Sequence, residues 1–94
     1  MNLDKAKKRI AKKVKMGFQG YPVMEIAYLG DTKESASEVL VSFLLDETAD
    51  RMQERFQSET DARESDVIQS AIVKMIERSE AKTVKVAEGI ALRA

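Results

Sequence analysis

Two stretches of alternating apolar residues, 23–29 and 39–45, constrain the fold of this chain more than any other feature of its sequence. A period of two is the pattern of a β-strand, because successive side chains point to opposite faces of a sheet. The polar loop between them, 30–37, begins with Gly-Asp, which favours a turn. The simplest pairing of two strands joined by a short loop is an antiparallel hairpin. The second strand is apolar on nearly both faces, so we expect other elements to cover both.

Helical spacing of apolar residues predicts a helix on each side of this hairpin. The first helix, over 3–15, has one narrow stripe, and Asn2 and Gly17 suit its two ends. The second, over 62–79, has a wide apolar face. Asp61 is followed by an acid three residues later, which is the spacing of a capping box, so we expect Asp61 to cap this helix. In this helix we expect three residues to face Val41 and Phe43 of the hairpin, namely Ile68, Ile72 and Ile76.

A short additional helix is predicted across 48–57, because its apolar residues also have helical spacing. Asp46 or Thr48 would cap it. Its apolar stripe continues from Leu45 and consists of Ala49, Met52 and Phe56.

A third strand is predicted over 83–87, with an extension across Gly89 to Leu92, and Lys85 would protect its exposed edge. The sequence leaves its partner strand open. If 48–57 and 62–79 form a helical hairpin, the third strand runs antiparallel to the second. If the short helix is only a turn, the longer helix is a crossover and the strands run parallel.

The fold class is therefore α/β (α+β): an N-terminal helix, an antiparallel β-hairpin, two helices and a third strand, forming a small mixed or antiparallel sheet packed by helices. With 94 residues, of which 44% are hydrophobic, the chain has the size and composition of a single domain over 1–94. We divide it into a basic N-terminal helix, 1–16, and an α/β body, 17–94.

The sequence contains no cysteine and no histidine. Disulfides, thiolate metal sites and histidine-based nucleophile systems are therefore excluded. We expect no enzymatic activity, no catalytic residue, no cofactor and no bound metal. The most apolar stretch, Val39 to Leu45, is far shorter than the ~20 residues of a membrane-spanning helix, and the N-terminus lacks the apolar run of a signal peptide. We therefore expect a cytoplasmic protein without membrane contact.

Charge is distributed unevenly along the chain. Residues 1–30 carry seven basic and two acidic side chains, a net of +5, and residues 31–94 carry nine basic and fourteen acidic side chains, a net of −5. Six basic residues of the first helix are candidate contacts for an anion or a nucleic acid. They are Lys5, Lys8, Arg9, Lys12, Lys13 and Lys15. The alternative is a helix that packs its apolar stripe on the sheet and leaves these side chains in solvent or facing an acidic neighbour.

Two further groups of residues are weaker candidates. An acidic group could hold a divalent cation, but it lacks the central glycine of a calcium loop, and acids are common at helix N-termini. An aromatic group beside Gly17 and Gly20 could line a small pocket, or simply pack in the core. The acidic group consists of Glu59, Asp61, Glu64 and Asp66. The aromatic group consists of Phe18, Tyr21 and Tyr28.

The stretch Lys15-Met-Gly-Phe-Gln-Gly-Tyr-Pro-Val-Met-Glu-Ile-Ala-Tyr-Leu-Gly30 and the run Phe56-Gln-Ser-Glu-Thr-Asp-Ala-Arg63 resemble a small bacterial family of uncharacterised proteins. The resemblance covers most of 15–90. It implies a compact α/β domain and brings no activity with it. Members of that family continue into a short tail with Cys and His, which is not present in these residues.

The order of 38–45, 48–57 and 62–79 also resembles the strand, short helix and long helix of ribbon-helix-helix repressors. That resemblance implies a DNA-binding dimer. The outward residues of the strand would be Leu40, Ser42 and Leu44, and two leucines cannot hydrogen-bond base edges.

We expect a non-catalytic protein-interaction or self-associating module that forms a homodimer, with an unidentified protein partner. The alternative is a nucleic-acid-binding protein that uses the basic helix or a ribbon-helix-helix-like unit. Apolar contacts between two copies would come from Leu3, Ile10 and Val14, or from Ile90 and Leu92.

Overall fold

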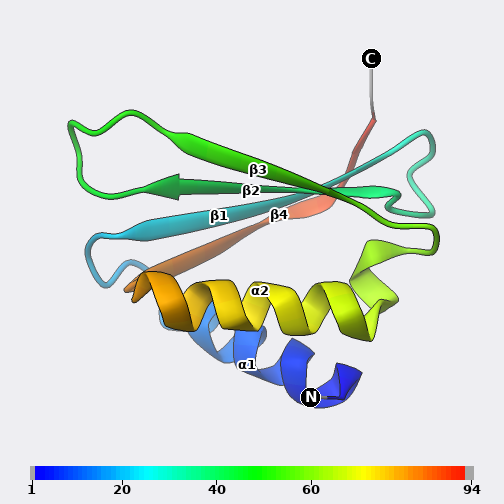
Figure 1. Cartoon of the computed structure of the whole chain (residues 1–94), viewed down its shortest axis with the longest axis horizontal. Coiled ribbons are helices and arrows are strands. Elements are labelled where there is room, and N and C mark those ends of the chain that lie inside the picture. Colours follow the sequence, from blue (N-terminus) through cyan, green and yellow to red (C-terminus); the bar gives the residue numbers. More distant parts are fainter. Residues whose placement is uncertain (1, 93–94) are drawn as a thin grey trace.

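Two helices lie together on one face of a four-stranded sheet (Figure 1). The computed structural model describes residues 2–92. The predicted fold class is confirmed, since helices pack on a small mixed sheet. The elements in chain order are α1 (Leu3–Lys15), β1 (Val23–Gly30), β2 (Glu38–Leu44), β3 (Met52–Gln57), a 3-10 turn η1 (Ala62–Glu64), α2 (Asp66–Ser79) and β4 (Thr83–Leu92).

The strands lie side by side in the order β3-β2-β1-β4. The predicted hairpin is confirmed, because β1 and β2 pair antiparallel from Val23 opposite Leu44 to Leu29 opposite Glu38. β4 pairs with β1 in parallel, which answers the question that the sequence left open. β3 is antiparallel to β2 and so runs in the same direction as β1 and β4. The segment containing α2 is thus a crossover that joins the two edge strands of the sheet.

The helix predicted across 48–57 is wrong, because residues 52–57 form strand β3. Met52 and Phe56 fit both a helical stripe and a strand in which every second residue faces the core. Pairing with β2 favours the strand. Without β3, β2 would be an edge strand, and β3 supplies partners for its unpaired backbone N–H and C=O groups. Asp46 caps no helix; its carboxylate accepts hydrogen bonds from the backbone N–H and the hydroxyl of Thr48, at 2.8 and 2.9 Å.

This strand also removes the basis of the ribbon-helix-helix resemblance. That motif needs a short helix directly after its strand, and the structure has a second antiparallel strand there. The DNA-binding unit inferred from this order of elements is therefore not formed.

The predicted bounds of α1 are confirmed. The side chain of Asn2 accepts a hydrogen bond from the backbone N–H of Lys5 at 2.9 Å. Gly17 follows the helix with φ of +72°, a conformation in which glycine has no steric penalty. Ala6 and Ile10 are buried against the rest of the protein, so the narrow apolar stripe packs within this chain.

The start of α2 differs from the prediction. The helix begins at Asp66, and the Ser65 hydroxyl caps it by accepting a hydrogen bond from the backbone N–H of Ile68 at 3.2 Å. Asp61 caps the preceding 3-10 turn instead, by accepting from the backbone N–H of Arg63 at 3.1 Å. The helix ends at Ser79, as predicted.

The core lies between the helices and the face of the sheet that they cover. Ile72 and Ile76 are buried there with Val41, while Ile68 and Phe43 are partly buried at its margin. This arrangement matches the expected packing of the second helix on the hairpin. The largest fully buried side chains are those of Met24, Ile26, Ile72, Val39, Val84 and Thr83.

One buried polar residue of α2 was not anticipated from the sequence. The Gln69 side-chain amide donates hydrogen bonds to the Tyr28 hydroxyl at 2.9 Å and to the Ala62 carbonyl at 3.1 Å. It thereby joins β1, η1 and α2 within the core. Burial raises the pKa of the Tyr28 phenol, and the hydrogen bond from Gln69 partly opposes that shift.

The expected extension of the third strand across Gly89 is confirmed. The register with β1 shifts between the pairs Ile26–Val86 and Tyr28–Ile90, which marks a bulge. Gly89 lies in that bulge with φ of +68°. Two extra residues of β4 are accommodated there, so that Ile90 and not Glu88 lies opposite Tyr28, and Ile90 is buried.

We expect Ile72→Ala to lower the free energy of unfolding by about 2–5 kcal/mol, because it leaves a cavity in a core position that is only 1% exposed. Urea denaturation followed by circular dichroism measures this change. Val67→Ala is the matched control, since Val67 lies on the same helix and is 74% exposed. A loss for Ile72→Ala no larger than that of the control would contradict the described core.

Candidate functional site

The seven basic residues of α1 separate into two sets in the folded protein. Three of them have partners outside the helix: Lys7 pairs with Glu64 at 2.6 Å, and Arg9 pairs with Glu77 at 3.0 Å. The Lys13 ammonium donates a long hydrogen bond of 3.4 Å to the carbonyl of Ala81. These contacts fasten α1 to the acidic body of the chain.

The other four basic residues form what we call the lysine stripe, which consists of Lys5, Lys8, Lys12 and Lys15. All four are exposed, and none forms an ion pair or side-chain hydrogen bond with a described residue. Spacings of three, four and three place them on one side of the helix, opposite the buried Ala6 and Ile10. The stripe is about 15 Å long.

The six candidate anion contacts are therefore not equivalent. Lys5, Lys8, Lys12 and Lys15 are exposed without an ion-pair partner among residues 2–92, and Lys12 also borders the groove beside α2, whereas Arg9 and Lys13 are turned toward α2 and the segment after it. The sequence could not reveal this division, because the partners are separated from the helix by 57 to 68 positions in the chain.

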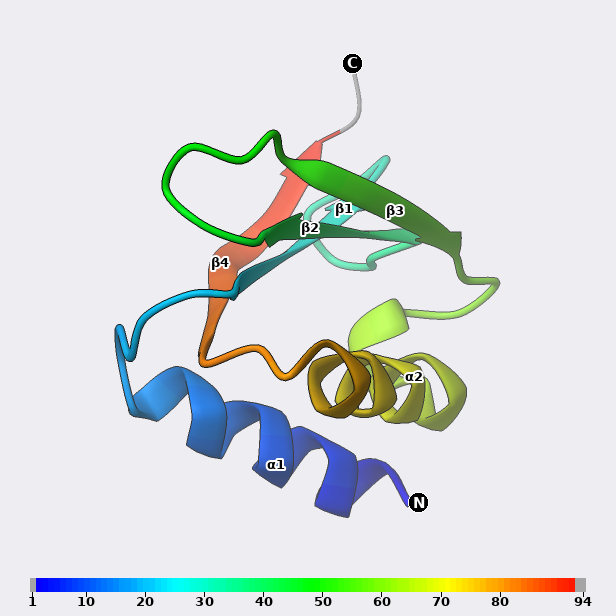
Figure 2. The ribbon, with the colours of Figure 1, turned by 60° about the vertical axis from the view of Figure 1, so that its left-hand side comes forward.

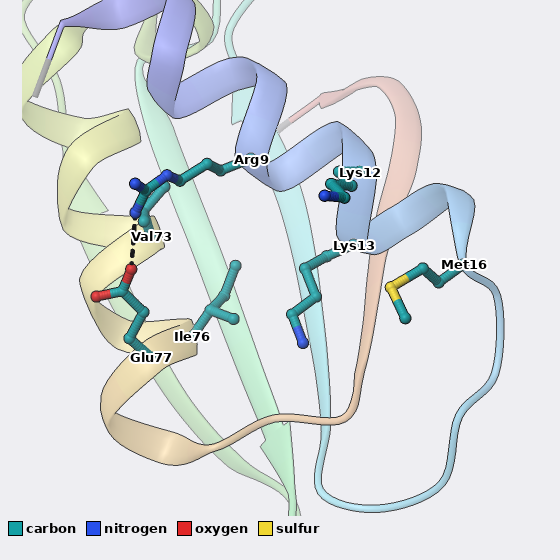
Figure 3. Close-up of a pocket in the computed structure, with 7 residues that line it drawn as sticks. All are labelled: Arg9, Lys12, Lys13, Met16, Val73, Ile76 and Glu77. Carbon is teal, nitrogen blue, oxygen red and sulfur yellow. Dashed lines mark hydrogen bonds and ion pairs between the residues drawn. The ribbon is translucent and has the colours of Figure 1, made fainter.

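A groove of about 260 Å³ separates α1 from α2 (Figure 3). Val73 and Ile76 contribute its apolar floor, and the Arg9–Glu77 ion pair joins the two helices across it. Its complete lining consists of Arg9, Lys12, Lys13, Met16, Val73, Ile76 and Glu77. These side chains can hold an apolar group next to an anion. They include no hydroxyl, thiol or imidazole, so the groove lacks the residues of serine-, cysteine- and histidine-based nucleophile systems.

On the opposite side of the molecule, the sheet presents a face that neither helix covers (Figure 2). Strand pairing shows which residues share this open face, since directly opposed residues point to the same side. It consists of Val23, Glu25, Ala27, Leu29, Glu38, Leu40, Ser42, Leu44, Gln53, Arg55, Gln57, Thr83, Lys85 and Ala91. Leu40 is half-buried near its middle, and Leu29 is half-buried at the end of the face next to the β1–β2 loop. A hollow of about 490 Å³ lies over part of it.

Two ion pairs cross the open face. Arg51, just before β3, reaches Glu25 of β1 at 3.1 Å, and Arg55 of β3 reaches Glu38 of β2 at 3.1 Å. The Glu38 side chain is only 4% exposed, so its pairing with Arg55 compensates a carboxylate largely removed from water. The charged side chains on this face are therefore largely neutralised, and the leucines lie between them.

The acidic group considered as a cation site does not form one. The Asp61 carboxylate receives the Arg63 guanidinium through two hydrogen bonds, at 3.0 and 2.7 Å, and Glu64 pairs with Lys7. Among residues 2–92, no three or more Asp or Glu side chains gather closely enough to hold a metal ion.

The three aromatic residues considered as a pocket lining are not brought together. Phe18 and Tyr21 form an edge-to-face pair with ring centres 5.7 Å apart. Tyr28 lies in the core instead, where Gln69 binds its hydroxyl.

Four of the five residues proposed for apolar contact between two copies are used inside this chain. Ile10 and Ile90 are buried in the core, Val14 packs against it, and Leu3 is half-buried on α1. Only Leu92, at 53% exposed, remains available. No helix within residues 2–92 is long and apolar enough to cross a membrane.

We expect Asp61→Asn to destabilise the fold in a pH-dependent way, because the hydrogen bonds from Arg63 lower the pKa of Asp61 to about 2. A carboxylate with a depressed pKa stabilises the native state at pH values above its pKa in the unfolded chain, which is near 3.9. This contribution disappears as the pH falls toward 2. The ion pair is partly solvated, so we expect a loss of about 1 kcal/mol at pH 7. Urea denaturation between pH 7 and pH 2 measures it.

Glu59→Gln is the control for this experiment, since Glu59 is an exposed carboxylate two residues away. We expect no comparable change from it. A difference between wild type and Asp61→Asn that stays constant from pH 7 to pH 2 would show that the charge of Asp61 is not responsible.

Comparison of this chain with protein-family models, with curated proteins and with solved structures gave no match. The resemblance to a small bacterial family stays a prediction.

Proposed function

We propose that this chain is a non-catalytic interaction module that associates with a second copy of itself through the open face of its sheet. The single observation that supports this proposal is the position of both helices on the other face (Figure 2). The leucines that lie among the polar residues of the open face therefore have no helix packed over them. We also propose that the chain acts in the cytoplasm, because a domain without cysteine does not need an oxidising compartment to form disulfides.

The chemistry of the open face suits contact with an identical surface. In a twofold dimer each patch meets its own copy, so a patch of one strong charge would repel itself. Here Glu25 pairs with Arg51, the residue before β3, and Glu38 pairs with Arg55 of β3. Leu29 and Leu40 would supply the apolar contact that exposed ion pairs alone cannot provide.

The size of the face sets the expected strength of association. Four strands about 4.8 Å apart and seven residues long give a surface of roughly 15–20 Å by 23 Å. This is small beside the ~800 Å² per partner of a standard interface. The loop 45–51 would have to contribute, and Leu45 on it is 52% exposed. We therefore expect a dimer that dissociates in the micromolar range.

Leu40→Glu tests this proposal, because it places a charge at the middle of the open face. We expect sedimentation velocity at 10–100 μM to show wild-type dimers and at least a tenfold weaker association of the variant. Val67→Glu is the control, since Val67 is exposed on α2, in the other layer. Circular dichroism checks that both variants are folded. A wild-type protein that stays monomeric at 100 μM, or a variant that dimerises equally well, would contradict the proposal.

A further inference from the structure

We propose that the lysine stripe of α1, together with Phe18, binds single-stranded nucleic acid. This site lies in the helix layer and is independent of the open face of the sheet. It goes beyond self-association, because it assigns a chemically defined partner to the opposite side of the molecule.

The first step is the availability of positive charge. Ion pairing within the chain accounts for Lys7 and Arg9, yet it leaves four lysines in one row without a partner among residues 2–92. The acid of α1, Asp4, lies in the first turn, so the row beyond it is uninterrupted. A row of unpaired ammonium groups attracts a polymer of phosphates, and the release of condensed counterions drives binding.

The second step is an exposed aromatic ring just beyond the row. Phe18 is 60% exposed and lies three residues after Lys15, so the two Cα atoms are at most about 11 Å apart. Its ring packs against Tyr21 at an interplanar angle of 78°. Every nucleobase has a flat face that can stack on such a ring.

The third step is the order of the loop that carries Phe18. The Thr83 hydroxyl accepts a hydrogen bond from the backbone N–H of Gln19 at 2.8 Å and donates one to the Gly20 carbonyl at 2.7 Å. The side-chain amide of Gln19 donates a further hydrogen bond to the Met16 carbonyl at 2.8 Å. These bonds tie the loop to β4 and to the end of α1. Phe18 is thus presented on an ordered loop, which reduces the entropy lost on stacking.

The same features favour a single strand over a duplex. Stacking on Phe18 needs an unstacked base, which a single strand offers and a duplex does not. The stripe has no Arg, Asn or Gln, so it offers no planar guanidinium or amide group to form paired hydrogen bonds with base edges in the major groove. We therefore expect binding with little sequence preference.

The test is fluorescence anisotropy with a labelled twelve-nucleotide oligothymidine, over a series of salt concentrations. For contact with four phosphates, we expect log affinity to fall with log salt at a slope of about −2.8. The double variant Lys8→Gln/Lys12→Gln should reduce that slope by about 1.4. Phe18→Ala should weaken binding about 5- to 150-fold and leave the slope unchanged. Each altered side chain is exposed, and circular dichroism verifies folding.

The control is Lys33→Gln/Lys74→Gln, which removes two exposed lysines outside α1 and should leave both affinity and slope near the wild-type values. A twelve-base-pair duplex should bind at least tenfold more weakly than the single strand. The inference is overturned if the oligonucleotide fails to bind at 50 mM salt, if both double variants act alike, or if the duplex binds as well. It is also overturned if the protein prefers vesicles of 30% phosphatidylserine to the oligonucleotide, which would assign the stripe and Phe18 to a membrane surface.

Discussion

The path from β3 to β4 determines most of this structure. Those two strands are the opposite edges of the sheet, so the segment between them must pass across β2 and β1. α2 makes that crossing, and its isoleucines cover the apolar side chains of the central hairpin. α1 then fills the remaining space on the same face, because its narrow stripe needs only a shallow site between α2 and β4. Both helices thus lie on the same face of the sheet, and neither covers the other face (Figure 2).

The local elements of this fold were largely predictable from the sequence, and the long-range pairing was not. The hairpin and both long helices have unambiguous periodicity, and α1 ends at residues with the expected capping chemistry, whereas α2 is capped by Ser65 and not by Asp61. β3 was missed because Met52 and Phe56 satisfy two periodicities, and only the unpaired edge of β2 selects the strand. The direction of β4, antiparallel to β2, is one of the two that the sequence allows, but its pairing with β1 depends on β3, which occupies the other side of β2.

The candidate sites show the same limit. The sequence identified α1 as the basic element and excluded histidine and cysteine chemistry, because these statements depend on composition alone. It could not say which lysines stay free, since Glu64 and Glu77 become neighbours of α1 only through the fold. Gln69 was overlooked for a related reason: a polar residue between apolar ones is normally assigned to solvent, and its partner Tyr28 is 41 positions away.

The two-layer arrangement of helices and sheet has a consequence for valency. If two copies join through their open faces, the assembly has four layers, with the sheets inside and one α1 helix on each outer surface. The two lysine stripes then point away from each other, and a short strand cannot touch both. Such a dimer gains no avidity for one short strand. It acts as a bridge that holds two separate strands, or two distant parts of a long one, on opposite sides of one particle.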